Sequence, residues 1–386
     1  MSHTARTPAD VIIVGAGLAG SAAATLLARQ GVRVTLIDPW QAFPDLFRAE
    51  KLEPDQIALL RQFGLLDALL PHAGHIHQIW EAEDGRVLHI EHREQFGVSY
   101  QDMVNGMRST VPAEVDFVVG RVEKIASEGE LQRVTLADGQ ERTARIVAVA
   151  CGTGGDLHAR LGIQRRMIQK DQSLAFAFTI APADGSPFPF DAVTYYPDGS
   201  ADRVFYLTLF RLGNVMRANL FVCWSGTDAS TRAFVREPRT ELSRLLPKLA
   251  GVIGEVDVLS RVETGRVDLY RAEGLDQAGV VLLADAFESV CPTTGMGLTK
   301  VFTDVDVFCH ECMPRWLATP GIGAQTLSGF YDHPRKRHVD DDSLRVAWAN
   351  RQLAVNNALP WRMRRAKRRW MMRASSFWAT SGSPGS

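Results

Sequence analysis

The sequence predicts an α/β fold in which a parallel sheet of Rossmann type is interleaved with a second, mixed sheet, and C-terminal helices follow. Three observations predict it. The chain opens with a strand, a glycine-rich turn and a helix. Residues 279–308 repeat that order of strand, glycine loop and helix. Between the two, residues 173–225 alternate or run apolar between turn residues, which is typical of short strands.

Composition bounds the function before any motif is considered. The 386 residues are 46% hydrophobic and 23% charged, which suits two globular domains or one large α/β unit. A net charge of -1 gives no global field that would attract nucleic acid. Five cysteines make no disulfide framework and favour a reducing compartment. No uncharged apolar run reaches the roughly 18 residues that span a bilayer. We therefore expect a cytoplasmic protein.

The first forty residues carry the most informative pattern. Residues 11–14, VIIV, are typical of a strand buried in a parallel sheet. Residues 21–30, SAAATLLARQ, favour a helix that ends at Gly31. Residues 32–37 predict a second strand, which Asp38 closes. This order of elements is the context in which a glycine-rich turn binds a dinucleotide.

The turn itself has the spacing G-x-G-x-x-G, and each glycine has a mechanical reason. Gly15 permits the tight turn, Gly17 lets the backbone approach a pyrophosphate, and Gly20 lets helix and strand pack closely. The free N–H groups of the helix N-terminus then face the phosphates. Asp38 can accept hydrogen bonds from a ribose diol. NAD and FAD share this pattern, so the turn alone does not choose between them.

Residues 48–70, RAEKLEPDQIALLRQFGLLDALL, favour FAD. They resemble the group A flavoprotein monooxygenases, the family of p-hydroxybenzoate hydroxylase. In that family an arginine here, ahead of a helix that ends in L-G-L-x-D-x-L, lies beside the FAD. Phe63 stands for the first leucine of that ending. The resemblance implies that Arg48 contacts FAD; the alternative is a surface arginine that caps a helix.

Residues 284–299, ADAFESVCPTTGMGLT, align without gaps with a second FAD motif of the same family, G-D-A-A-H-x-x-x-P-x-x-G-x-G-x-N. The resemblance implies that Asp285 contacts the ribityl chain and phosphate region and that Pro292 lies beside the flavin ring. It implies that four more residues approach the pyrimidine end of the isoalloxazine with their backbone: Gly295, Gly297, Leu298 and Thr299. A helix N-terminus there can favour negative charge on reduced flavin.

The second motif departs from the family at four positions, which alters how the protein tunes the flavin. Ala284 replaces a glycine, Phe287 an alanine, Glu288 a histidine and Thr299 an asparagine. The alternative interpretation of the stretch is a strand–loop–helix connection with no ligand.

A third family motif, D-G-x-x-S-x-V-R-x-x-L-G, has kept its frame but lost its polar residues. Residues 151–163 read CGTGGDLHARLGI, with Gly152, Leu157, Leu161 and Gly162 in register. Three replacements remove the polar groups: Cys151 for aspartate, Gly155 for serine and His158 for arginine. Because the resemblance links this motif to NAD(P)H, three possibilities stay open. NAD(P)H binds differently, a separate reductase supplies reduced flavin, or the substrate itself reduces it.

The resemblance also divides the chain into interleaved regions. It implies an FAD-binding domain of residues 1–72, 98–165 and 271–320, a substrate domain of residues 73–97 and 166–270, and a C-terminal helical region of residues 321–386 with a basic tail. Within the substrate domain, residues 239–253, RTELSRLLPKLAGVI, predict one helix.

The substrate domain is expected to supply an apolar pocket. In the strand of residues 203–210, the period of two places Phe205 on one face with Leu207 and Leu209, and Tyr206 and Phe210 on the other. The pattern does not say which face meets the flavin. No catalytic residue is therefore named beyond the flavin-proximal loop, which contains Pro292, Gly295 and Gly297.

We interpret the remaining clusters of histidine and cysteine as surface or packing residues. His72, His75 and His77 lack a third ligand of known geometry, and Cys309 and Cys312 lack a second C-x-x-C, so we expect no metal. Cys291 is expected to be a small buried side chain.

The basic tail predicts an amphipathic helix with six residues on one face: Met363, Trp370, Met371, Ala374, Phe377 and Trp378. It either packs this face on its own protein, with arginines outward, or contacts an anionic membrane or an acidic partner. We favour the first.

The resemblance implies an FAD-dependent monooxygenase. Such a hydroxylase inserts one oxygen atom from O2 into an apolar, aromatic small molecule through a flavin C4a-hydroperoxide, with electrons from NAD(P)H. Alternatives on the same fold are a flavin reductase or dehydrogenase and an enzyme that depends on a separate reductase. A halogenase is disfavoured because the motif W-x-W-x-I-P is absent. A non-catalytic flavoprotein, acting as a sensor or scaffold, is the alternative from another class.

Overall fold

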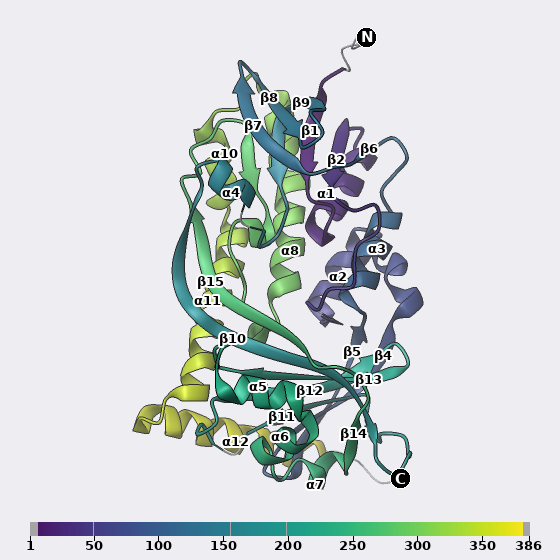
Figure 1. The fold of residues 1–386 in the computed structure, drawn as a ribbon, viewed down its shortest axis with the longest axis vertical. Coiled ribbons are helices and arrows are strands. Elements are labelled where there is room, and N and C mark those ends of the chain that lie inside the picture. Colours follow the sequence, from purple (N-terminus) through teal and green to yellow (C-terminus); the bar gives the residue numbers. More distant parts are fainter. Residues whose placement is uncertain (1–6, 49, 155, 198, 381–386) are drawn as a thin grey trace.

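The computed structural model describes residues 7–380 except 49, 155 and 198, without the side chains of 156 and 372–380. It confirms the predicted α/β class. One sheet lies at the top of Figure 1 and a second at the bottom, with helices around both.

The first sheet has the strand order β6-β2-β1-β9-β8-β7, with β16 beside β9. Its strands are β1 (Ala9–Val14), β2 (Val34–Asp38), β6 (Asp116–Val119), β7 (Val122–Glu128), β8 (Leu131–Leu136), β9 (Glu141–Val149) and β16 (Val280–Leu282). β6, β2, β1, β9 and β16 pair in parallel, whereas β7, β8 and β9 form an antiparallel meander. Residues 11–14 of β1 form a continuous apolar run that is buried on both faces, as expected for a central parallel strand.

The second sheet has the order β14-β10-β13-β12-β11-β4-β5-β3, with β15 beside β10. Its strands are β3 (Lys51–Leu52), β4 (Gly74–Glu83), β5 (Arg86–Gly97), β10 (Gln164–Pro182), β11 (Ala192–Tyr196), β12 (Val204–Leu212), β13 (Val215–Val222), β14 (Val256–Val258) and β15 (Glu263–Glu273). β10 and β15 pair along their length and run from the top half to the bottom half (Figure 1).

Helices cover the outer face of the second sheet. They are α5 (Ala229–Arg236), α6 (Pro238–Leu245) and α7 (Ala250–Ile253). Phe234 of α5 stacks on Phe176 of β10, with ring centroids 4.5 Å apart. The single helix expected over residues 239–253 is wrong, because Pro247 lies between α6 and α7 and has no N–H for a helical hydrogen bond.

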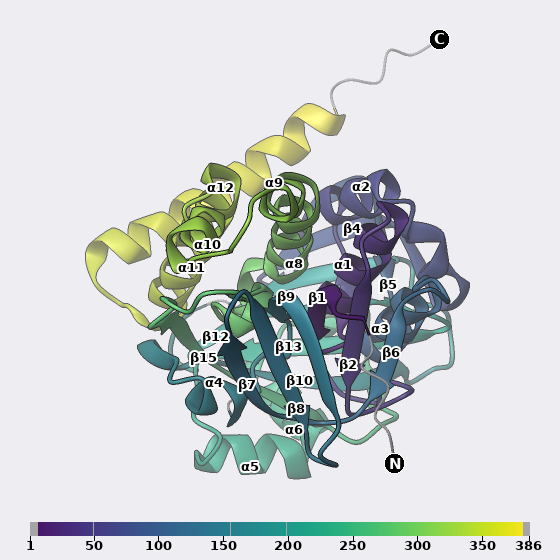
Figure 2. The same ribbon diagram turned by 90° about the horizontal axis from the view of Figure 1, so that it is seen from above.

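Most of the remaining helices lie around the first sheet or between the two sheets, whereas the last one packs against β5 of the second sheet. They are α1 (Leu18–Arg29), α2 (Pro54–Gln62), α3 (Tyr100–Ser109), α4 (Asp156–Arg160), α8 (Gly297–Asp306), α9 (Met313–Ala318), α10 (Ala324–Tyr331), α11 (Pro334–Val355) and α12 (Leu359–Thr380). A π-helical turn, Val307–Cys312, joins α8 to α9. Figure 2 shows α8, α10 and α11 side by side. In the described part of the chain, no helix is long and apolar enough to cross a membrane.

The face alternation of β12 is broken at its start. The register against β13 shifts between Val204 and Tyr206. Phe205 therefore packs with Phe221 and Tyr206, while Leu207 and Leu209 belong to the core under α5–α7. The prediction that Phe205 shares a face with Leu207 and Leu209 is wrong, because a bulge shifts side-chain alternation by one residue.

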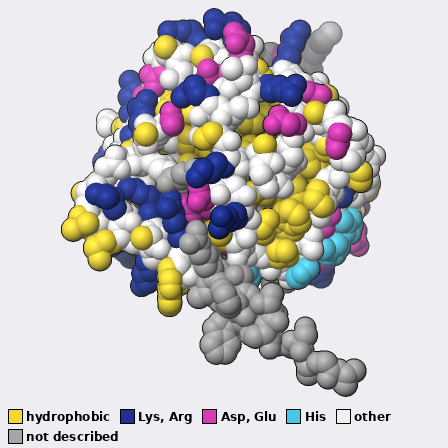
Figure 3. Space-filling model, turned by 90° about the horizontal axis from the view of Figure 1, so that it is seen from below, with side chains coloured by type: hydrophobic (Ala, Val, Ile, Leu, Met, Phe, Trp, Pro, Cys, Tyr) yellow, Lys and Arg dark blue, Asp and Glu magenta, His cyan; other side chains and the backbone are white. Residues whose placement is uncertain are grey.

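Helix α12 turns its arginines, not its apolar face, toward the protein. Arg369 pairs with Glu83 at 2.7 Å, and Arg368 lies 4.1 Å over the ring of Tyr196. By contrast, Trp370 is 69% exposed and Met363 63% exposed. The favoured expectation of an inward apolar face is thus wrong for the described part; Ala374, Phe377 and Trp378 lie outside the described side chains. Figure 3 shows basic and hydrophobic side chains together on this lower side of the molecule.

Candidate cofactor and substrate site

A cavity of about 740 Å3 lies between one face of the second sheet and the loops and helices that follow strands of the first sheet. Six residues predicted from the motifs line it: Arg48, Asp285, Pro292, Gly295, Gly297 and Leu298. Leu18, at the start of α1, also reaches it. Residues from distant parts of the sequence are thus brought to one space. Asp38, Thr299 and the three glycines of the first motif, Gly15, Gly17 and Gly20, are not among its lining residues.

The glycine turn after β1 is close-packed on one side and open on the other. Gly15 has φ +106°, and a Cβ there would lie 2.6 Å from the carbonyl oxygen of Ala150. A Cβ on Gly20 would lie 1.8 Å from the oxygen of Gly15. At Gly17 the nearest described atom would be the Tyr100 hydroxyl, at 4.0 Å. The fold itself requires Gly15 and Gly20, whereas Gly17 leaves space for an approaching group. Among the described residues, no side chain caps the N-terminus of α1.

Asp38 orders this turn through the backbone and an arginine. Its carboxylate accepts hydrogen bonds from the N–H of Ala16 at 2.7 Å and of Trp40 at 3.0 Å. Arg108 of α3 forms an ion pair with it at 2.9 Å and donates to the carbonyl of Ala16 at 2.7 Å. A role of Asp38 toward a ribose remains a prediction. Arg108 was missed, because a single arginine in a helix carries no motif.

The second glycine loop begins with strain. Ala284 has φ +52°, in the left-handed region that a side chain disfavours. Its N–H donates to Asp304 Oδ2 at 2.8 Å, and Lys336 Nζ holds the same carboxylate at 2.8 Å. The family glycine at this position therefore corresponds to a real conformational demand, which alanine meets at a cost.

Replacing Ala284 with glycine is expected to raise the free energy of unfolding by about 1 kcal/mol, because the left-handed conformation costs a glycine nothing. Ala286→Gly is the matched control: Ala286 has no positive φ and is fully buried, so that change should lower stability. Chemical denaturation of both variants checks this. Equal losses in the two would contradict the strain at Ala284.

Buried charges support the loop from behind. Glu288, at the position of the family histidine, is buried and pairs with Arg271. Lys300 and Asp340 pair in the same cluster, beside Lys336. Burial lowers the pKa of Lys336 to about 7. The departure at Glu288 thus belongs to an ionic cluster between α8, α11 and β15.

Asp285 meets the cavity at the point where the third motif reaches the second. Burial raises the pKa of Asp285, and Arg48 acts in the opposite direction. Tyr270 donates its hydroxyl hydrogen bond to the Asp285 carbonyl at 2.7 Å, and Arg165 lies 4.4 Å over the Tyr270 ring. His158 contacts the carbonyl of Ala286 through Nε2 at 2.7 Å. The altered third motif therefore holds the backbone beside Asp285; Gly155 lies outside the described residues.

The flavin-proximal loop is tied to the start of α2. Gln56 donates to the carbonyl of Gly295 at 3.0 Å and to the hydroxyl of Thr299 at 3.1 Å. Thr299 donates in turn to Asp55 at 2.6 Å. Gly295 has φ +70°, and α8 begins at Gly297. Among the described residues no side chain caps the N-terminus of α8, and its first two residues, Gly297 and Leu298, line the cavity. Gln56 was missed because no family motif in the sequence marks it.

The second sheet lines the cavity with the face of β12 and β13 opposite α5–α7. It presents five side chains there: Tyr206, Thr208, Phe210, Asn219 and Phe221. Tyr206 donates its hydroxyl to the carbonyl of Thr293 at 3.0 Å, which ties this face to the flavin-proximal loop. The face of β12 that carries Tyr206 and Phe210 therefore lines the cavity, which the alternation of side chains in the sequence did not decide.

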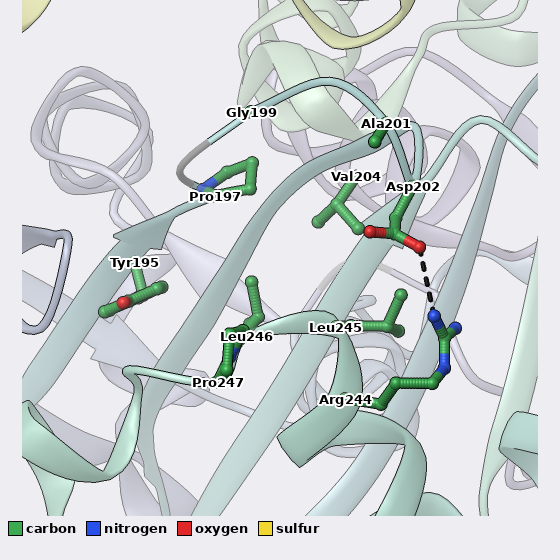
Figure 4. Close-up of a pocket in the computed structure, with 10 residues that line it drawn as sticks. All are labelled: Tyr195, Pro197, Gly199, Ala201, Asp202, Val204, Arg244, Leu245, Leu246 and Pro247. Carbon is green, nitrogen blue, oxygen red and sulfur yellow. Dashed lines mark hydrogen bonds and ion pairs between the residues drawn. The ribbon is translucent and has the colours of Figure 1, made fainter.

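A smaller hollow of about 210 Å3 lies away from the predicted residues (Figure 4). It lies between α6 and the loop that joins β11 to β12. Its two charged residues, Asp202 and Arg244, form an ion pair with each other at 3.1 Å. It shares no lining residue with the larger cavity, which is therefore the candidate site.

The histidines and cysteines make no competing site. Cys309 and Cys312 are buried beside α1 and α9, and Cys291 packs against Leu269 and Ala347. Among the residues that the structure describes, no group of three or more His, Cys, Asp or Glu side chains could hold a metal ion.

Comparison with known proteins identifies relatives of this chain. Squalene monooxygenase of Rattus norvegicus is 25% identical over 338 residues, which cover 80% of this chain and 55% of that protein. 6-Hydroxynicotinate 3-monooxygenase of Bordetella bronchiseptica is 26% identical over 222 residues, 51% of this chain and 58% of that one. The chain thus spans little more than half the length of these two relatives.

Among solved structures, p-nitrophenol 4-monooxygenase PnpA from Pseudomonas putida DLL-E4 has the same fold. Its TM-score is 0.75 at 18% identity, with 95% of this chain and 94% of that chain covered. A family model described as FAD binding domain matches residues 8–306, which include both glycine motifs and the cavity-lining strands. The chain therefore belongs to this FAD binding domain family, and its resemblance to the group A flavoprotein monooxygenases is confirmed.

Proposed function

We propose that the protein is an FAD-dependent monooxygenase that inserts one oxygen atom from O2 into an apolar, aromatic small molecule. One observation carries the proposal: a single cavity has the FAD motif residues on one wall and an aromatic sheet face on the other. The relatives with this arrangement are monooxygenases by name.

The residues present fit FAD. The open side of Gly17 and the uncapped start of α1 suit a pyrophosphate. Asp285 is placed to accept hydrogen bonds from sugar hydroxyls, and the N-terminus of α8 suits the electron-rich end of a flavin. When bound, FAD supplies the activation of O2. The protein supplies the binding, the orientation of the substrate and the exclusion of water.

Substrate would lie against the aromatic face. Tyr206, Phe210 and Phe221 offer flat apolar contacts, and Ala175 between them leaves room for a ring. The hydrogen bond from Tyr206 to the flavin-proximal loop fixes the distance between this face and the flavin wall. Fixed geometry of this kind favours reaction of a positioned substrate.

We propose NAD(P)H as the electron donor, with the separate reductase and the substrate-reduced flavin as alternatives. The third motif lacks its aspartate and arginine, and His158 is occupied by backbone carbonyls of Gly154 and Ala286. Arg165 lines the cavity and donates to the carbonyls of Thr153 and Gly154 in this motif, and it is the cation that we propose for the phosphate or amide of the nicotinamide nucleotide.

Anaerobic stopped-flow mixing of the FAD-loaded protein with NADH or NADPH tests the proposal. Bleaching of the flavin band within seconds, faster with an aromatic substrate present, supports the self-contained enzyme. If neither nucleotide bleaches the flavin, with or without aromatic compounds, the electron donor must be a reductase or the substrate. A flavin that no donor reduces would favour a non-catalytic flavoprotein.

For partners, we propose that the outer face of α12 contacts an anionic lipid surface. The 22 residues of α12 contain no Asp or Glu. The exposed Leu359, Met363 and Trp370 share one face, and Arg362 and Lys367 flank it. An apolar stripe bordered by cations suits the headgroup region of an anionic membrane better than a neutral one.

Co-sedimentation with vesicles tests this contact. The protein should bind phosphatidylglycerol–phosphatidylcholine vesicles more tightly than pure phosphatidylcholine, and Trp370→Ser should reduce binding. Leu259→Ser is the matched control, since Leu259 is equally exposed (63%) but lies beyond β14. Binding that is unaffected by Trp370→Ser, or absent from both vesicles, would exclude this role and leave an acidic protein partner.

A further inference from the structure

The main-chain carbonyl of Thr293, in the flavin-proximal loop, receives hydrogen bonds from two different elements. Tyr206 of β12 donates its hydroxyl at 3.0 Å, and Asn350 of α11 donates through Nδ2 at 2.8 Å. Burial raises the pKa of Tyr206 well above its ordinary value, so the hydroxyl keeps the proton that it donates. A carbonyl oxygen has two lone pairs, and these two side chains occupy both. The second sheet and a C-terminal helix thus hold one atom of the loop together.

Helix α11 is itself fixed beside the loop. Gln172 of β10 is buried and donates to the carbonyl of Ala347 at 3.0 Å. Arg351 donates to the carbonyls of Asp171 and Gln172 at 2.8 and 3.0 Å. These contacts lie where the register of β10 against β15 shifts, and such irregularities leave main-chain groups without a ladder partner. The helix uses these groups, so Asn350 is held at a fixed place.

Other main-chain oxygens of the loop are also bonded within the protein. The carbonyl of Cys291 accepts from the N–H and the hydroxyl of Thr294 at 3.1 and 2.8 Å. That of Pro292 accepts from the N–H of Gly295 at 3.1 Å, and that of Gly295 accepts from Gln56 at 3.0 Å. By contrast, the helix that follows, α8, brings its positive N-terminal end to the cavity. The loop therefore engages partial negative charges inside the protein beside a positive helix end.

We propose that Asn350 is a positioning residue for the flavin: together with Tyr206 it holds the Thr293 carbonyl away from the cavity, which favours the reduced, negatively charged form of FAD. Thr293 is not among the lining residues of the cavity, although its neighbour Pro292 is. Without its two donors the oxygen could turn toward the cavity, where its partial negative charge would oppose negative charge on the flavin. Asn350 lies beyond residues 8–306, which match the FAD binding domain family, so the C-terminal region contributes to the cofactor site. The proposal rests on FAD binding and not on the monooxygenase reaction.

A double-mutant cycle with Asn350→Leu and Tyr206→Phe tests the proposal, because each change removes one donor and nearly keeps the size of the side chain. The reduction potential of the bound FAD is measured at equilibrium against a reference dye. Each single variant leaves the carbonyl one donor, so the affinity for reduced relative to oxidised FAD should fall by about 2-fold. The double variant leaves the oxygen none, and the ratio should fall by about 10-fold, which lowers the potential of a two-electron couple by about 30 mV.

Gln352→Leu is the matched control, since Gln352 lies on the same helix but bonds Asn356; the potential should not change. Urea unfolding of each apoprotein and titration with oxidised FAD measure structural losses separately. The proposal is overturned if the double variant equals the product of the two single variants, or if stability and FAD affinity fall while the potential stays constant. If the double variant does not fold, Asn350→Leu must still lower the potential relative to Gln352→Leu.

The outcomes also separate this proposal from the proposed function. A wild-type protein that binds no FAD would overturn both. A potential that is equal in all variants would overturn only the role of Asn350. Because no turnover is measured, a protein that binds FAD but oxygenates no substrate would count against the monooxygenase and leave this positioning role intact.

Discussion

Gly17→Ala should lower the affinity for FAD by about 10- to 100-fold while the apoprotein keeps its stability. An added methyl group in a close contact costs about 1–3 kcal/mol. At Gly17 that methyl meets no described atom nearer than 4.0 Å, and the backbone there is extended, so the protein itself accommodates it. The methyl group occupies instead the side from which the pyrophosphate approaches. FAD titration by fluorescence and thermal unfolding of the apoprotein measure the two effects separately.

Two further glycines make this prediction specific. Gly20→Ala should prevent folding outright, because its Cβ would lie 1.8 Å from the oxygen of Gly15. Gly226→Ala, at a turn with no atom within 4 Å of the new Cβ, should change neither FAD binding nor stability. A Gly17→Ala protein that binds FAD as wild type does would show that the pyrophosphate lies elsewhere.

Arg108→Met should lower the free energy of unfolding by about 3–5 kcal/mol, the usual loss when one partner of a buried ion pair is removed. The arginine is 8% exposed, pairs with Asp38 and donates to the carbonyls of Ala16 and Trp40. Its removal leaves the buried Asp38 carboxylate with two backbone N–H donors but no counter-ion, and two carbonyls without their donor. Urea unfolding of the apoprotein measures the loss, and weaker FAD binding should accompany it because Ala16 belongs to the glycine turn.

The surface pair of Arg33 and Asp10 provides the control. It has a similar distance, 2.7 Å, but Arg33 is 56% exposed. Exposed pairs contribute about 0–1 kcal/mol, so Arg33→Met should barely change stability. Similar losses in the two variants would mean that the Arg108 contacts add little beyond a surface ion pair.

Local patterns predicted the central elements well. The glycine turn between β1 and α1 follows from short-range demands: a strand, a left-handed residue and a helix start. The same holds for the loop from Ala284 to α8. By contrast, the meander of β7, β8 and β9 was not predicted, although Gly129 and Gly139, both at positive φ, mark its two turns. Patterns spanning a few residues therefore predicted the part of the fold that holds the cofactor motifs.

Contacts between distant residues could not be predicted in this way. Gln56 meets Gly295 across 239 residues, and Arg108 meets Ala16 across 92. A single polar side chain has no period, so nothing in the sequence marks its partner. The error at α12 has a related cause: amphipathicity shows which residues share a face, but the buried carboxylate of Glu83 decides which face turns inward.

The paired strands β10 and β15 have a mechanical consequence. Their ladder runs from the half of the molecule with the first sheet to the half with the second sheet. It is interrupted only by register shifts between Met167 and Ser173. Rotation of one half against the other would have to bend both ribbons together and break hydrogen bonds along them. The paired strands thus resist a change in the distance between the two walls of the cavity. Substrates of different size must be accommodated by side chains and by the loop before β3, so the width between the walls is set during folding and not by each turnover.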